Sequence, residues 1–320
     1  MCASLSLLAA ALPAVTAAAD DYPSRPIRFI VPFPPGGGTD IYARIIGPKL
    51  AEGLRQQVVV DNRAGAAGAL GAELAARAPA DGYTIWIGQT SNLAIVPALR
   101  TRNTYDPIRD FSPITLISKA PSVFVVNADS PLKSIKDLVA AARSGPAGKL
   151  TYATAGIGSS AHIAGELLKQ VTGIDATHVP YKGASPAMID LRGGRLTYMG
   201  TSLASASQFV REGKIRAIAT TGAKRAYLMP DVPTVAEQGY PGFESISFLG
   251  MLAPAKTPRT IIDRLNREIV SLLKSPEVQK MVQFEGGEIF AGTPEDFAAF
   301  LKSELPKWAQ VIKKAGITAE

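Results

Sequence analysis

The stretch IRFIVPFPPGGGTD, residues 27–40, decides the fold. Its first part, Ile27 to Val31, is a short apolar run bounded by prolines, which is the pattern of a buried strand. Three glycines follow, and Thr39 or Asp40 is placed to cap a helix that we expect to run to about Leu54. Strand, glycine-rich loop and helix in this order indicate an α/β protein.

The same order recurs along the rest of the chain. We expect further strands at Val58–Val60, Tyr83–Gly88, Val123–Val126, Leu150–Thr154, Thr177–Tyr181, Leu196–Met199, Ile215–Thr220 and Ser245–Ala253. We expect further helices at Gly65–Arg77, from Ser134 onward, at Ser160–Val171, Ser185–Leu191, Pro258–Lys274 and Pro294–Ala315. Such alternation favours mainly parallel sheets covered by helices.

The length of 320 residues favours two lobes, because single cores stop growing near roughly 250–300 residues. The chain crosses between the two α/β units near Lys119–Ser122 and returns around Ser245–Leu249. Two crossings with a cleft between the lobes describe a hinged clamshell. We therefore divide the chain into residues 20–121 (first part of lobe I), 122–244 (lobe II) and 245–320 (return strand and C-terminal helices of lobe I).

Residues 1–19 are predicted to be a secretory signal peptide. They carry no charged residue, contain the apolar stretch Leu5–Leu12, and end in small residues before Asp20. Cleavage near Ala19 would remove Cys2, the only cysteine, which precedes the apolar stretch and so cannot be a lipoprotein cysteine. We expect an exported, periplasmic protein.

Composition excludes several classes of protein. A hydrophobic fraction of 47% excludes a disordered chain. The net charge of +7 comes from scattered Lys and Arg, which is not the clustered pattern of a nucleic-acid binder. One cysteine and two histidines cannot build a zinc cluster or a disulfide framework, so we expect no metal and no cofactor.

Two glycine-rich loops, Pro34–Asp40 and Ala155–Ser160, each join a strand to a helix. Unpaired N–H groups and the partial positive charge at a helix N-terminus form an anion site. Neither loop contains Lys or Arg, so a small carboxylate fits better than a triphosphate. Glycine-rich turns often serve geometry alone, but two in corresponding places favour binding.

An enzyme is not expected. Gly156–Ala161 matches the G-x-G-x-x-A dinucleotide pattern, yet Asp175 precedes the next strand where an acid should end it, so a dinucleotide-dependent oxidoreductase is only an alternative. No nucleophile elbow is present. His162 lies two residues after Ser160 and faces another side of its helix, which favours a capping or cleft-facing role. We expect His178 to be a structural hydrogen-bonding group.

Polar residues also follow other predicted strands, where α/β sheets place ligands. Thr90, Ser91 and Asn92 follow the third strand, and Lys182 takes the equivalent place in lobe II as the one cation placed to meet a carboxylate. Asn62 and Arg63 are expected to brace the first glycine-rich loop.

Several motifs together carry a resemblance that spans Tyr22 to about Gly316. They read YPSRPI at 22–27, VPFPPGGGTD at 31–40, VDNR at 60–63, DGYT at 81–84, GIGSSAH at 156–162, HVPYKG at 178–183, LMPDVPTVAE at 228–237 and LAP at 252–254. In these motifs the chain resembles the substrate receptors of tripartite tricarboxylate transporters, the Bug family.

The resemblance implies a monomeric periplasmic receptor with the two-lobed type II binding-protein fold. It would close on a small carboxylate and deliver it to a membrane permease of one large and one small subunit; a ligand-presenting sensor is the alternative. The residues implied around the ligand, with the neighbouring candidates, are Phe33, Gly36, Gly37, Gly38, Thr39, Asp40, Thr90, Ser91, Asn92, Gly158, Ser159, Ser160, His162 and Lys182.

One departure from the family pattern bears on the ligand. Where the family often has an aromatic residue followed by Asp-Asn, this chain has Gly200-Thr201-Ser202. Loss of the acid removes a partner for a ligand ammonium, and Gly200 is expected to make room. We therefore expect an aromatic dicarboxylate such as terephthalate, with Thr201 and Ser202 bonding its distal carboxylate.

Overall fold

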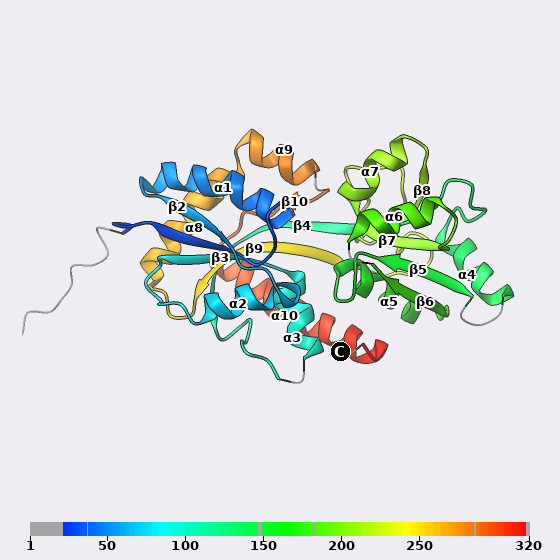
Figure 1. The fold of residues 1–320 in the computed structure, drawn as a ribbon, viewed down its shortest axis with the longest axis horizontal. Helices are drawn as coiled ribbons and strands as arrows, with labels where there is room; N and C mark the ends of the chain where they lie inside the picture. The colour runs from blue at the N-terminus through cyan, green and yellow to red at the C-terminus, as the bar shows by residue number, and fades with distance from the viewer. Residues whose placement is uncertain are drawn as a thin grey trace, which may run out of the picture.

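The computed structural model describes residues 22–36, 38–100, 102–145, 149–181, 183–284 and 286–317. The molecule is elongated, with two α/β lobes side by side (Figure 1). Two long antiparallel strands, β4 (Phe111–Asn127) and β9 (Ile246–Pro254), run along the junction between them.

The sheet of lobe I has the strand order β2-β1-β3-β9-β4. Its parallel strands are β1 (Ile27–Val31), β2 (Val58–Asn62) and β3 (Thr84–Gln89), and the short β10 (Glu288–Ile289) pairs with β4. The helical segments of this lobe are α1 (Gly38–Leu54), η1 (Ala66–Gly68), α2 (Ala69–Ala76), η2 (Ser91–Ile95), α3 (Val96–Leu99), α8 (Arg259–Leu273), α9 (Pro276–Phe284) and α10 (Pro294–Ala315).

Alternation along the strands creates a core on each face of this sheet. Phe29 packs in the cluster that α1 and α8 cover, whereas the next residue, Ile30, packs in the cluster that α2 and α10 cover. Successive side chains of a strand point to opposite faces, so a continuous apolar run such as Ile27–Val31 requires helices on both sides.

Lobe II has the same layered construction. Its strands are β5 (Leu150–Thr154), β6 (Ala176–Pro180), β7 (Tyr198–Ser202) and β8 (Ile215–Thr220), with the C-terminal half of β4 between β7 and β8. Its helices are α4 (Ile135–Ser144), α5 (Ser160–Thr172), α6 (Ala184–Arg192) and α7 (Leu203–Arg211). Phe124 packs in the cluster with α4 and α5, and Val125 in the cluster with α6 and α7.

Strand β4 changes partners at the junction. Up to Pro121 it pairs with β9, and from Ser122 onward it pairs with β7 and β8. Three residues fasten this point: Ser122 N–H donates to Thr221 Oγ1 (2.8 Å), and Thr221 Oγ1 donates to the Ser245 carbonyl (2.6 Å). Thr221 therefore joins the outgoing strand to the chain that returns to lobe I. We keep the division into lobes proposed from the sequence.

Most predicted elements are found within two residues of their expected bounds. Strands β1, β5 and β8 and helix α10 match fully, and Ser134 caps α4 by accepting the Asp137 N–H (3.1 Å). The single helix expected from Gly65 to Arg77 is wrong, because Ala66, Ala67 and Gly68 have φ of 50°, 55° and 91°, so that the α-helix α2 begins only at Ala69. Helices α7 and α9 were not anticipated.

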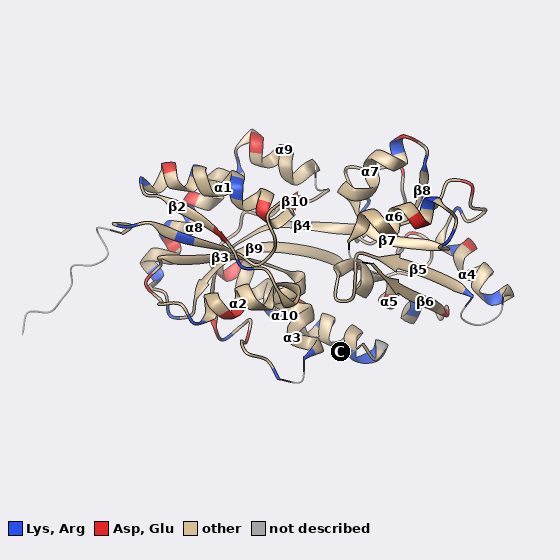
Figure 2. Cartoon of the chain, in the orientation of Figure 1, with Lys and Arg blue, Asp and Glu red and all other residues tan. Residues whose placement is uncertain are grey.

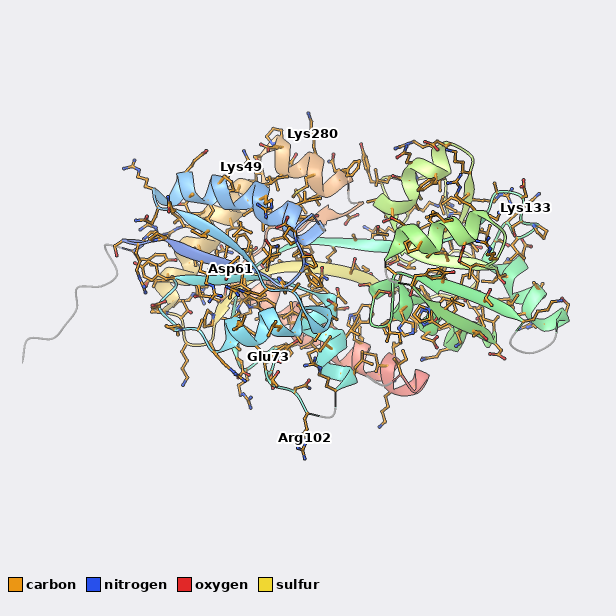
Figure 3. All side chains as sticks on the ribbon, in the orientation of Figure 1. Lys49, Asp61, Glu73, Arg102, Lys133 and Lys280 are labelled. Carbon is orange, nitrogen blue, oxygen red and sulfur yellow. The ribbon has the colours of Figure 1, made fainter. Side chains whose placement is uncertain are left out.

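Charged side chains are spread over both lobes, with no basic run on one element (Figure 2). The labelled Arg102, Lys133 and Lys280 extend from the outer edges of the molecule (Figure 3). Among the described residues no helix is both long and apolar enough to cross a membrane.

Substitutions of two adjacent buried threonines test the hydrogen bonds at the point where β4 changes partners. Thr221→Val leaves a buried N–H and a buried C=O without partners, which should lower the free energy of unfolding by about 1–3 kcal/mol. Thr220 is equally buried, but its hydroxyl has no partner among the described residues, so Thr220→Val should be neutral or stabilising. Urea unfolding of both variants checks this, and equal losses would contradict it.

Candidate ligand-binding site

A cavity of about 300 Å³ lies between the lobes, and we call it the front cavity. Its lobe I wall includes Gly38, Thr39 and Gln89, and its lobe II wall includes Ser159 and Ser202. The carboxyl ends of parallel strands in both sheets lead into its lining segments, which is the edge where open α/β sheets bind ligands.

Four helices begin at the front cavity. The first residues of α1 (Gly38), α5 (Ser160) and α6 (Ala184) line it, as does Ser202, which caps α7. Each helix N-terminus carries unpaired N–H groups and a partial positive charge. Their convergence creates a positive potential without any ionised side chain.

No Asp, Glu, Lys, Arg or His is among the described residues that line the front cavity. Polar lining atoms are instead hydroxyls and one side-chain amide, with apolar Pro121, Phe248 and Leu249 between them. Such a wall suits an anion with an apolar body, since dipoles replace its hydration without a fixed countercharge.

The first glycine-rich loop is braced from inside by Asp40, which is 1% exposed. Its carboxylate accepts from Gly36 N–H (2.8 Å), Arg44 Nε (2.7 Å) and Asn62 Nδ2 (2.9 Å). Burial raises the pKa of Asp40, but these hydrogen bonds outweigh it and hold the pKa below its usual value. Asn62 braces this loop as predicted, whereas Arg63 pairs with Asp61 (2.9 Å).

The end of β3 supplies the neighbouring wall. Thr39 Oγ1 donates to Gln89 Oε1 (3.0 Å), and Gln89 Nε2 donates to Ser91 Oγ (3.1 Å). Thr90 Oγ1 accepts the Phe248 N–H (2.7 Å), which fastens this wall to the returning strand β9. The side chains at the start of α1 and at the end of β3 are therefore held in one network.

The second glycine-rich loop rests on the two histidines. Gly156 and Gly158 have φ of 136° and 76°, which side chains rarely allow. Gly158 N–H donates to His162 Nδ1 (3.3 Å), so this nitrogen must be unprotonated. Thr154 Oγ1, bonded to His178 Nε2 (2.8 Å), holds Gly156 through its carbonyl (3.2 Å).

The two imidazole rings stack face to face, with centroids 4.0 Å apart. Burial lowers the pKa of His162, and burial together with the neighbouring His162 lowers the pKa of His178 to about 3. The charged groups of α5 that face the pair are Glu166, bonded to Tyr152 and Lys169, and Lys169 itself. Both histidines are therefore neutral at pH 7.

Gly200 lines the front cavity, as do the next two residues, Thr201 and Ser202. A Cβ on Gly200 would lie 3.1 Å from the Ala161 carbonyl oxygen and 3.5 Å from Phe124. The missing side chain therefore lets the first turn of α5 approach β7. That it also makes room for a ligand stays a prediction.

The structure brings part of the predicted set to the front cavity. Seven candidates line it: Gly38, Thr39, Thr90, Ser159, Ser160, Thr201 and Ser202. Seven others are not in its lining and instead lie in or beside the lining segments: Phe33, Gly36, Asp40, Ser91, Asn92, Gly158 and His162. Gly37 and Lys182 lie outside the described residues.

Sequence reasoning missed lining residues that come from the crossover strands, from within helices and from the last position of β3: Tyr42, Gln89, Ser118, Ser122, Ser205 and Ser247. A signal was present in Ser118, Ala120 and Ser122, which are small residues at alternate positions of an otherwise apolar strand. Alternate residues share one face, so this pattern indicates a strand face that borders a polar space.

Residues 42–317 match the family model described as the tripartite tricarboxylate transporter family receptor. The chain belongs to this family.

Three solved structures are similar over almost the whole chain. The periplasmic binding protein BugD is 35% identical, with a TM-score of 0.78 over 93% of this chain and 100% of BugD. R. palustris Rpa4515 with adipate is 36% identical, with a TM-score of 0.81 over 93% and 99%. MatC from Rhodopseudomonas palustris with bound malate is 31% identical, with a TM-score of 0.78 over 91% and 100%.

These similarities confirm the two-lobed fold of a periplasmic binding protein and the resemblance found in the sequence. A member of this receptor family is a substrate-binding protein, not an enzyme. The alternative of a dinucleotide-dependent oxidoreductase is therefore wrong.

The stacked histidines predict a pH-dependent stability. Their folded pKa values lie below the ordinary 6.5, so the unfolded chain binds more protons below that pH. The resulting loss of stability should be absent above pH 7 and should grow as the pH falls below 6.5. For His178 it should grow by up to about 1.4 kcal/mol per pH unit down to about pH 3, and the lowered pKa of His162 adds to the loss in the same direction. His178→Gln should reduce the dependence of the unfolding free energy on pH between about pH 7.5 and 5.5, a range around the unperturbed histidine pKa. Urea unfolding at several pH values measures this dependence. An unchanged slope would contradict it.

Proposed function

We propose that this chain is a periplasmic receptor that binds a small dicarboxylate in the front cavity and delivers it to a membrane permease of one large and one small subunit. The observation that carries the proposal is the meeting of four helix N-termini in a cavity whose described lining residues carry hydroxyls and no ionised side chain. The adipate and malate bound by two similar structures are both dicarboxylates.

Two groups of lining hydroxyls suit two carboxylates. The first lies in the first turn of α1 and at the start of α5, with Thr39, Ser159 and Ser160. The second lies where β7 leads into α7, where Ser202 caps the helix and its Oγ lies 2.8 Å from Ser205 Oγ. We assign the distal carboxylate to this second group, together with Thr201.

The ligand that we propose is an aromatic dicarboxylate such as terephthalate. The apolar Phe248 and Leu249 suit an apolar body between two carboxylates, and no lining acid among the described residues suits a ligand ammonium. Export through a signal peptide at residues 1–19, which lie outside the described residues, and a monomeric state are parts of the same proposal. A receptor that presents its ligand to a signalling partner is the alternative, and it uses the same cavity.

Thermal melting against terephthalate, adipate, malate and aspartate tests the ligand class. A ligand at 100 times its Kd stabilises the folded state by about 2.7 kcal/mol, which should raise the Tm by several degrees. We expect the largest shift with terephthalate. A larger shift with aspartate would contradict the exclusion of a ligand ammonium, a larger shift with adipate or malate would contradict the aromatic ligand, and no shift with any acid would contradict the carboxylate receptor.

Ser159 provides a residue-level test. Its Oγ accepts the His162 N–H (3.2 Å), which leaves the hydroxyl hydrogen free to donate to a carboxylate. Ser159→Ala should weaken binding of the best dicarboxylate by about 1.5–3 kcal/mol, or roughly 10- to 150-fold in Kd, measured by calorimetry.

The matched control is Ser134→Ala. Ser134 caps α4 in the same way (3.1 Å to Asp137 N) but does not line the front cavity. Each variant should lose about 1 kcal/mol of stability with its cap, whereas only Ser159→Ala should lose affinity. Equal affinities in the two variants would place the carboxylate elsewhere.

A further inference from the structure

A second cavity, of about 380 Å³, lies on the other side of the crossover strands, and we call it the back cavity. Ser118, Ala120, Pro121 and Ser122 of β4 line the front cavity, whereas Lys119 lines the back cavity. From Ser118 to Ala120 this division follows from the alternation of side chains along a strand, and Pro121 departs from it just before β4 changes partners. The two cavities therefore flank the same hinge.

Both lobes contribute to the back cavity. Ile163 and Leu167 come from α5 of lobe II, and Phe300 and Trp308 come from α10 of lobe I. The two helices touch directly, because Gln170 Nε2 of α5 donates to the Val311 carbonyl of α10 (3.0 Å). An occupant of this cavity would contact both lobes and would be linked to the angle between them.

The Lys119 side chain lines this cavity, and its ammonium forms no ion pair among the described residues. Its Nζ lies 4.1 Å from the ring centroid of Phe290 and 4.2 Å from that of Phe300. Cation–π contacts attract the charge but do not accept the N–H groups as an oxygen would. Burial lowers the pKa of Lys119 despite the nearby Glu304 and Glu244, so these carboxylates do not offset its desolvation.

Trp308 lines the same cavity. The residue is 5% exposed, and its indole N–H is buried from solvent and has no acceptor among the described residues. The N–H groups that an occupant of the cavity can reach are therefore those of the Lys119 ammonium, which has no ion pair among the described residues.

The two acids of the lining, Glu244 and Glu304, do not form an ion pair with Lys119. Glu304 is paired with Lys307 (2.5 Å), and Glu244 is exposed to solvent. We infer that the back cavity binds a small monocarboxylate with an apolar body, its carboxylate on Lys119 and its body against Ile163, Leu167 and Phe300. The inference does not depend on the ligand of the front cavity.

Sodium hexanoate is the probe. Calorimetry of the whole chain should show saturable binding, and Lys119→Met should weaken it by about tenfold or more, since a charge-assisted bond is lost. Lys302→Met removes the same charge from an exposed position of α10 that does not line the cavity, and it should leave binding unchanged. Trp308→Phe keeps an aromatic ring in the cavity wall and removes only the buried N–H, so it should leave binding nearly unchanged.

Ser159→Ala separates the two cavities, because Ser159 lines the front cavity and does not line the back cavity. Hexanoate binding that falls with Lys119→Met and persists with Ser159→Ala supports the inference. Binding that falls with Ser159→Ala and persists with Lys119→Met overturns it, as does the absence of saturable binding to the unmodified chain. Should Lys119→Met fail to fold, Lys119→Gln takes its place, and unchanged affinity in that variant overturns the inference.

Discussion

The structure depends on one strand that belongs to two sheets. Strand β4 is 17 residues long, and its partners change from β9 to β7 and β8 between Pro121 and Ser122. Because the strand is continuous, the sheets of the two lobes contain the same strand direction and the same alternation of side chains between their faces. The carboxyl ends of β1 and β3 in one lobe and of β5 and β7 in the other therefore lead to one cleft, where the helices that follow these strands begin.

The electrostatics of the front cavity follow from this convergence. A buried Lys or Arg would hold a carboxylate strongly but would cost desolvation whenever the cavity was empty. Helix N-termini and hydroxyls avoid this cost because they carry no net charge and make hydrogen bonds within the protein. Ser159, for example, accepts a backbone N–H while its hydroxyl hydrogen stays free. The charges that support this arrangement, such as Asp40 with Arg44, lie outside the lining and stabilise the loop instead of the ligand.

Sequence reasoning located the parts of the site that are local. Thr39 and Ser159 stand at loop-to-helix junctions, and glycine spacing and capping preferences mark such junctions in the sequence. Tyr42 reaches the cavity from a helix interior, which no local pattern marks. Gly200 lines the cavity, but its closest neighbour, the Ala161 carbonyl oxygen, belongs to another element and could not be read from its motif.

The sequence by itself determined the α/β elements, the two-lobed division and the chemistry of the two glycine-rich loops. These depend on hydrophobic periodicity and on backbone preferences, which act over a few residues. Only the tertiary structure decided which side chains face the front cavity and which face the back cavity. It also decided that the two histidines stack beneath the second loop. These contacts join residues distant in the chain, and their distances depend on the packing of whole helices against a shared strand.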